Sequence, residues 1–175
     1  MKHFEGRTAS NRAPITVDYE GRMDIIMTHA VLESLFTIFS TMVGLKISPG
    51  VPETKLDTRA RGVVSSLIGM EAAGAQGSVA LSLPLPSIRE ISRSLMGHEL
   101  TAADREAADM AGELNNMLVG GAKRILSERG FDFDMQRPTL LMGEGHEIVH
   151  HYAGQTVLLP IQLGQDEFFV ELNFE

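Results

Sequence analysis

The chain has 175 residues, of which 43% are apolar and 22% charged, and its net charge at pH 7 is -8. This composition is typical of a soluble single-domain protein, and no uninterrupted apolar run reaches the roughly eighteen residues that a membrane span requires. The acidic balance disfavours nucleic acid and anionic membranes as partners, because both require clustered lysine and arginine. Since the chain has no cysteine, disulfides, thiolate metal sites and cysteine nucleophiles are excluded.

Residues 1–22 contain basic residues but no apolar stretch after them, so they do not match a secretory signal. We expect these residues to form a flexible N-terminal extension and residues 23–175 to form the single domain. A cytoplasmic location is the corresponding expectation.

The first half of the chain is predicted to hold one long helix and a hairpin. Apolar residues occur almost all round the helical wheel from Asp24 to Val43, which predicts a helix buried on most sides and ended by Gly44. Prolines and a glycine between residues 49 and 52 predict a turn. The segments Val63–Met70 and Ser78–Leu83 then predict two strands of a hairpin around a Gly-rich connection.

Two helices are predicted next, followed by strands. A capping box of Ser87 and Glu90 predicts a short helix that Gly97 ends. A second start signal, at residues 101–104, opens a long apolar periodicity that continues to Gly130. Four short strands are predicted to complete the chain: Thr139–Met142, Ile148–Tyr152, Val157–Leu163 and Glu167–Phe174.

The two halves repeat each other loosely at a period of about ninety residues. The strand pair VVSSLIG and GSVALSL has a counterpart in VLLPIQLG and FFVELNF, although chance similarity between two hairpins is an alternative explanation. We therefore predict an α+β fold, with a mainly antiparallel sheet, two long helices packed on it, and a pseudo-twofold duplicated helix-plus-hairpin unit.

The candidate chemistry lies on the second long helix, in the stretch DMAGELNNMLVGGAK. At about 100° per residue, Asp109, Glu113 and Asn116 fall within an arc of about 60° on the face opposite the apolar stripe. Gly120 follows on the same face, where glycine costs about 1 kcal/mol relative to alanine and therefore suggests close approach of another chain. An acid and an amide on a solvated helix face are also common without any function.

This helix resembles the signature helix of the CheC/CheX chemotaxis phosphatases. The family pattern of an acid or serine, a glutamate, an asparagine and a downstream proline corresponds to Asp109, Glu113, Asn116 and Pro138. The gap between Asn116 and Pro138 is one residue shorter than in the usual family pattern. Further similarity covers VVSSLIGM, GSVALSL, SLMGHEL and FFVELNFE, so the resemblance extends over most of the chain from Asp24 onward.

The resemblance implies a CheC/CheX-like fold and a phosphatase that acts on the aspartyl phosphate of a CheY-like receiver domain in chemotaxis or two-component signalling. Asn116 would position the attacking water and Glu113 would dock the receiver, with Asp109, Gly120 and Pro138 as binding residues. The chain would need no cofactor or metal of its own, because the receiver would supply the magnesium. The family resemblance and the alternating terminal stretch EFFVELNFE also imply a homodimer joined through its sheets.

The first long helix is predicted to lack a second site. In HAVLESLFTIF, Glu33 is present but Phe36 occupies the position of the asparagine. The chain thus resembles the CheX branch, which has one site per chain, and Glu33 is interpreted as structural or incidental.

The sequence allows two rival interpretations. His146, Glu147 and His150 form the H-E-x-x-H pattern of zinc proteases, but nearby glycines and β-branched residues predict a strand, in which the histidines would lie about 13 Å apart. The other rival is a non-catalytic module that binds a receiver domain or another signalling partner without hydrolysis. The amide of Asn116 favours the enzyme, because docking alone does not need a group that orients water.

Overall fold

The computed structural model describes residues 23–175, so the predicted flexible extension at residues 1–22 lies outside the described residues. The helices are α1 (Met23–Ile38), the π-helical turn η1 (Phe39–Val43), α2 (Leu85–Met96) and α3 (Arg105–Glu128). The strands are β1 (Ser48–Pro49), β2 (Glu53–Lys55), β3 (Val64–Ala72), β4 (Ala75–Leu83), β5 (Asp134–Met135), β6 (Thr139–Met142), β7 (Thr156–Leu163) and β8 (Asp166–Phe174).

One antiparallel sheet organises the described part of the chain, with the strand order β1-β7-β8-β4-β3-β5. β2 also pairs with β7, and β6 also pairs with β3. The hairpins β3–β4 and β7–β8 meet in the middle of the sheet, where β4 pairs with β8 from Gly77 opposite Phe174 to Ser82 opposite Phe169. Each half therefore places its short outer strands against the hairpin of the other half, which confirms the predicted duplicated, pseudo-twofold α+β arrangement.

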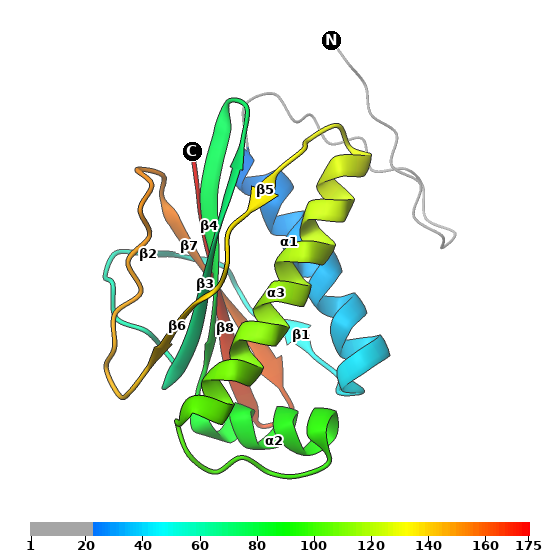
Figure 1. Ribbon diagram of the computed structural model, residues 1–175, viewed down its shortest axis with the longest axis vertical. Coiled ribbons are helices and arrows are strands. Elements are labelled where there is room, and N and C mark those ends of the chain that lie inside the picture. Colours follow the sequence, from blue (N-terminus) through cyan, green and yellow to red (C-terminus); the bar gives the residue numbers. More distant parts are fainter. Residues whose placement is uncertain (1–22) are drawn as a thin grey trace.

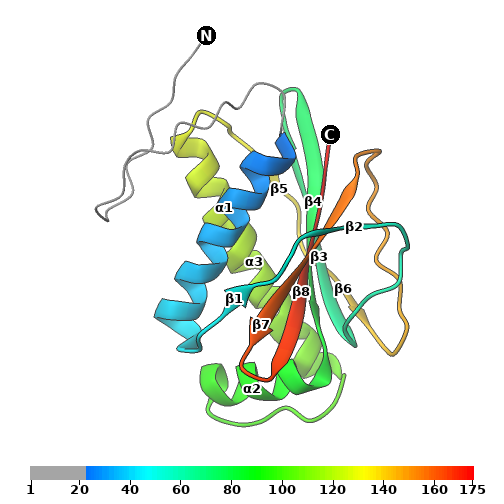
Figure 2. The ribbon, with the colours of Figure 1, turned by 180° about the vertical axis from the view of Figure 1, so that it is seen from behind.

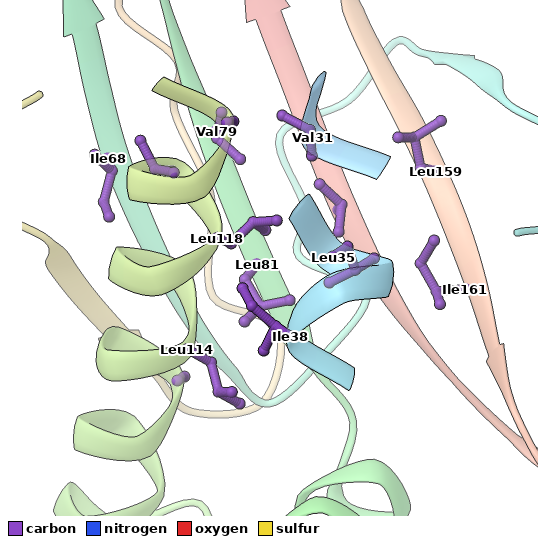
Figure 3. Close-up of a cluster of buried hydrophobic side chains, with 14 of the residues drawn as sticks. Val31, Leu35, Ile38, Ile68, Val79, Leu81, Leu114, Leu118, Leu159 and Ile161 are labelled. Atoms are coloured by element: carbon purple, nitrogen blue, oxygen red, sulfur yellow. The ribbon is translucent and has the colours of Figure 1, made fainter. Parts of the chain in front are cut away.

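Both long helices cover the same face of this sheet (Figures 1 and 2). α1 packs against α3 and β8, whereas α3 packs against β3, β4 and β6, and α2 closes one end of the molecule. The core between the helices and the sheet holds buried side chains from both layers (Figure 3). Leu35 of α1, Leu118 of α3 and Leu81 of β4 are examples, each stabilising the fold by about 1.5–3 kcal/mol through burial.

Contact between α1 and α3 is close at one point. Ser34 of α1 donates a hydrogen bond at 2.8 Å to the carbonyl oxygen of Leu118, and Gly121 lies beneath the same serine, where a Cβ would overlap the hydroxyl. The segment Met23–Val43 has the length and the mean hydropathy, 1.4, of a membrane span. Its buried residues instead pack on α3 and the sheet, as expected for a core helix of a folded domain.

Several predicted boundaries need correction. The predicted capping box is wrong, because α2 begins at Leu85 after Pro84 and the Ser87 hydroxyl donates to the Glu167 carbonyl oxygen at 2.6 Å. In the predicted helix start at residues 101–104, Asp104 is the residue that caps a helix. Its carboxylate accepts a hydrogen bond from a backbone N–H of α3.

The predicted strand Ile148–Tyr152 is also wrong. This segment crosses the outer face of the sheet without forming a strand, and the isolated bridge next to it joins Glu147 to Arg59. Ile148 is buried there beside Ala60 and Ala80, and its N–H donates to the Thr58 carbonyl oxygen at 2.7 Å. Burial in a small second core therefore explains the β-like pattern without a sheet partner. The predicted turn at residues 49–52 lies between β1 and β2, two strands too short to show a period.

Candidate functional site

The face of α3 that carries the predicted site points away from the sheet. Leu114 and Leu118 belong to the opposite, apolar stripe and are buried in the core. Asp109, Glu113 and Asn116 are all exposed. The predicted orientation of the helix is confirmed, and the carboxylate of Glu113 and the amide of Asn116 are both accessible to a partner.

Asn115 fixes this orientation, and the sequence analysis missed it. Its side chain is fully buried, and Nδ2 donates to the Ser66 carbonyl oxygen at 2.9 Å, with Ser66 Oγ and the Val79 carbonyl oxygen both at 3.2 Å. These contacts tie α3 to β3 and β4 at the residue next to Asn116. Since successive helical residues are about 100° apart, anchoring Asn115 on the sheet directs Asn116 outward. A polar residue within the apolar stripe was the signal that could have revealed it.

A second wall faces α3 across a shallow pocket, and it comes from the link between β5 and β6. The backbone N–H of Gln136 donates to the Gly69 carbonyl oxygen of β3 at 2.9 Å, and its side-chain Nε2 lies 3.3 Å from Glu71 Oε1. Tyr152 also donates to Glu71 at 3.2 Å, and the pKa of its phenol is raised, first by burial and then by this hydrogen bond. This wall is therefore held by β3.

The pocket between the two walls has a volume of about 480 Å³. Its lining brings together four predicted site residues from two segments and adds three that the sequence analysis did not single out: Glu113, Asn116, Gly120 and Pro138, with Met135, Gln136 and Arg137. Asp109 does not line the pocket. It forms an ion pair with Arg105 at 2.9 Å on the same helix, so its charge is already partly satisfied.

Glycine serves two different purposes in α3. At Gly112 a Cβ would lie 2.8 Å from Leu140 Cδ2, so this glycine lets β6 approach the helix. At Gly120 a Cβ would meet no atom within 4 Å among the described residues. The packing of the chain itself therefore does not require a glycine at position 120, and the missing side chain enlarges the pocket beside Asn116.

The pocket offers polar groups whose hydrogen-bonding capacity is free within the described chain. Neither Glu113 nor Asn116 forms a side-chain hydrogen bond or ion pair with any residue between 23 and 175. An amide can both donate and accept a hydrogen bond without titrating, whereas a carboxylate can pair with a cation. The arrangement can therefore orient a water molecule and hold a basic side chain of a docked partner.

The first helix has no comparable arrangement. Glu33 pairs with Arg129, which follows α3, at 3.4 Å, and Phe36 occupies the exposed position one turn later. The interpretation of Glu33 as a structural residue agrees with this ion pair.

The H-E-x-x-H segment is extended rather than helical, and both of its histidines are bound to serines of the sheet. His146 Nδ1 lies 2.7 Å from the Gly143 carbonyl oxygen, and its Nε2 lies 2.8 Å from Ser65 Oγ. His150 Nδ1 accepts from Ser78 at 2.6 Å, and its Nε2 donates to the buried Glu171 at 3.1 Å. Since both nitrogens of each ring already lie within hydrogen-bond distance of a protein group, neither ring presents a free zinc ligand.

Comparison with known proteins relates the chain to a family whose matched region includes this site. A family model of the chemotaxis phosphatase CheX matches residues 64–162, which include the whole of α3 and the pocket. The search of curated proteins gave no match.

Solved structures extend the similarity over nearly the whole described chain. A chemotaxis protein CheX from Vibrio vulnificus is 39% identical, with a TM-score of 0.77, over 85% of this chain and 99% of that one. A CheC-like superfamily protein from Shewanella sp. PV-4 is 35% identical, with a TM-score of 0.80, over 87% and 99%. CheX in a CheX-CheY-BeF3-Mg2+ complex from Borrelia burgdorferi shares the fold at 20% identity and a TM-score of 0.71, over 85% and 97%.

An antiparallel sheet covered by two long helices is the fold that this chain shares with the CheC-like and CheX proteins. The match to the family model and the identities above show that the chain belongs to the CheX family of chemotaxis phosphatases.

Proposed function

We propose that this protein hydrolyses the aspartyl phosphate of a CheY-like receiver domain, with Asn116 orienting the attacking water and Glu113 docking the receiver. The observation that carries the proposal is the pocket itself, in which both side chains are free of partners within residues 23–175 and lie on one wall facing Pro138. Family membership and the CheX-CheY complex from Borrelia burgdorferi support the receiver as the partner.

The chemistry requires little more than positioning. Phosphoryl transfer demands an in-line nucleophile and stabilisation of charge, and it needs no covalent intermediate on the catalyst. The amide of Asn116 can accept a hydrogen bond from the attacking water and donate one to a phosphoryl oxygen. The Glu113 carboxylate can pair with a receiver lysine beside the phosphorylated aspartate and so hold the receiver in register.

Magnesium is assigned to the partner. The Borrelia burgdorferi complex contains BeF3 and Mg2+ together with CheY, and the magnesium of a receiver belongs beside its phosphorylated aspartate. Within residues 23–175, no three His, Asp or Glu side chains are grouped so as to hold a metal ion. In this proposal the receiver supplies both the phosphoryl group and the magnesium, and the residues of this pocket position the attacking water and the receiver.

The test is single-turnover decay of phosphorylated receivers from the same genome, measured beside their affinity for the chain when loaded with BeF3 and Mg2+. Asn116→Ala is expected to slow the accelerated decay by about 100-fold or more and to leave affinity nearly unchanged, because the side chain is exposed and alanine suits a helix. Glu113→Ala is expected to reduce both. Decay by Asn116→Ala at the parental rate would exclude the mechanism, and tight binding without accelerated decay would identify a non-catalytic receiver-binding module.

A further inference from the structure

Arg137 lies in the pocket wall formed by the β5–β6 link, on a backbone fixed from both sides. Before it, the N–H of Gln136 is bonded to the Gly69 carbonyl oxygen of β3. After it, Pro138 has a φ angle fixed by its ring, and Thr139 begins β6, which pairs with the same strand. The backbone of Arg137 is therefore held in place while its exposed side chain reaches into solvent at the pocket.

The charge of this side chain is not used within the described chain. Of the eight arginines between residues 23 and 175, six form ion pairs with a carboxylate, and Arg59 and Arg137 form none. Glu113 lines the same pocket and is likewise without an ion pair among these residues. A protein with a net charge of -8 has many carboxylates available, yet two opposite charges remain unpaired on different walls of one pocket.

Opposite charges on two walls match a partner that carries the complementary pair. An arginine fork binds a carboxylate through two parallel hydrogen bonds, so it fixes direction as well as position. Receiver domains build their magnesium site from oxygen ligands, which places carboxylates around the phosphorylated aspartate. The phosphoryl group and the carboxylates that bind magnesium already have a cationic partner, so an acidic side chain at the rim of the site, outside the magnesium ligands, is the better match for Arg137.

We propose that Arg137 is a specificity-determining docking residue that forms a bidentate ion pair with an acidic side chain at the rim of the receiver's phosphorylation site. Glu113 holds a basic group of the receiver from the α3 wall, and the two contacts together select one orientation and one set of partners. The inference rests on the proposed function, because it takes the receiver as the partner that enters the pocket.

The experiment compares the parent full-length chain with Arg137→Ala, Arg137→Lys and Arg137→Glu, using receivers from the same genome loaded with BeF3 and Mg2+. Arg59→Ala is the matched control, because it removes the same charge from the other exposed, unpaired arginine of residues 23–175, which lies beside Gly145 on the outer face of the sheet. Affinity is measured at several salt concentrations, and single-turnover decay is measured at saturating concentrations of each variant.

Arg137→Ala is expected to weaken binding about fivefold to tenfold and to reduce its salt dependence, whereas the maximal decay rate changes by less than about twofold. Arg137→Glu should weaken binding further, and Arg137→Lys should bind between the parent and the alanine variant because it keeps the charge without the fork. Arg59→Ala should match the parent. Unchanged affinity of Arg137→Ala overturns the inference, as does a lower maximal rate at unchanged affinity, which would place the guanidinium on the phosphoryl group.

These results are distinguishable from a failure of the proposed function. If the parent binds a receiver without accelerating its decay, the catalytic proposal fails, while the affinities still decide the role of Arg137. If the parent binds none of the receivers, both proposals are wrong.

Discussion

Replacing Gly120 with alanine is expected to make the protein more stable and less active. A glycine inside a helix costs about 0.8–1.0 kcal/mol relative to alanine, and a Cβ at this position meets no atom of the described residues 23–175 within 4 Å. The whole gain should therefore appear in the free energy of unfolding. For a domain of this size it corresponds to a rise in Tm of roughly 2–4 °C.

The same methyl group would project into the pocket beside Asn116, where the receiver is expected to approach. A displacement of about 1 Å between a catalytic group and its target can cost up to about 100-fold in rate. We expect the maximal rate of receiver dephosphorylation to fall at least about tenfold in Gly120→Ala. Thermal unfolding and single-turnover decay measure the two effects independently.

The neighbouring Gly121→Ala variant is the matched control, and the opposite result is expected. Its Cβ would overlap the Ser34 hydroxyl and disturb the hydrogen bond to Leu118, so overpacking should outweigh the gain in helix propensity and destabilise the protein by about 2 kcal/mol. Below its Tm, this variant should retain the parental maximal rate within about threefold. A stabilised Gly120→Ala with full activity would refute the assignment of Gly120 to the docking surface, and a destabilised one would refute the open space inferred there.

Four further predictions concern the rest of the molecule. Asn115→Ala should lower the free energy of unfolding in urea by about 2–4 kcal/mol, because it removes the hydrogen bonds that the buried Nδ2 donates to Ser66 and Val79 and leaves a cavity; a change below about 1 kcal/mol would contradict its role as an anchor. Lys55→Met should cost about 3–5 kcal/mol, since it removes the 2.6 Å ion pair of the buried Glu171, and adding Glu171→Leu should restore only part of the loss, because the buried His150 Nε2 then loses its 3.1 Å contact with Glu171. Elemental analysis should find no stoichiometric zinc; one tightly held zinc per chain, lost on replacing His146 or His150, would contradict this. We expect a homodimer, so light scattering at high micromolar concentration should give twice the chain mass of 19.1 kDa, and a monomeric mass would argue against it.

Long elements with a strong period were predictable from the sequence. The helix from Arg105 to Glu128 and both hairpins lie close to their predicted bounds, because apolar periodicity over many residues reports directly which face is buried. The exposed positions of Glu113 and Asn116 followed from the same period.

What the sequence did not reveal depends on contacts between distant segments. The far wall of the pocket forms because Gln136 bonds to β3, roughly 67 residues earlier in the chain, and a two-residue strand such as β5 has no period of its own. Ile148 shows why the last predicted strand was wrong, since burial in a small outer core gives the same apolar signal as sheet pairing. Arg137 could not be singled out from the sequence, because its lack of an ion pair is visible only in the folded structure.

The interleaving of the two halves constrains how this molecule can specialise. All the proposed catalytic and docking residues come from the second half, yet β5 and β6, which flank the far wall of their pocket, pair with β3 of the first half, and β1 and β2 pair in return with β7. Neither half could be excised as a free-standing module, since each would lose the edge on which its own outer strands assemble. The first half, which carries Phe36 in place of an amide, thus serves as the scaffold for the half that holds the proposed site.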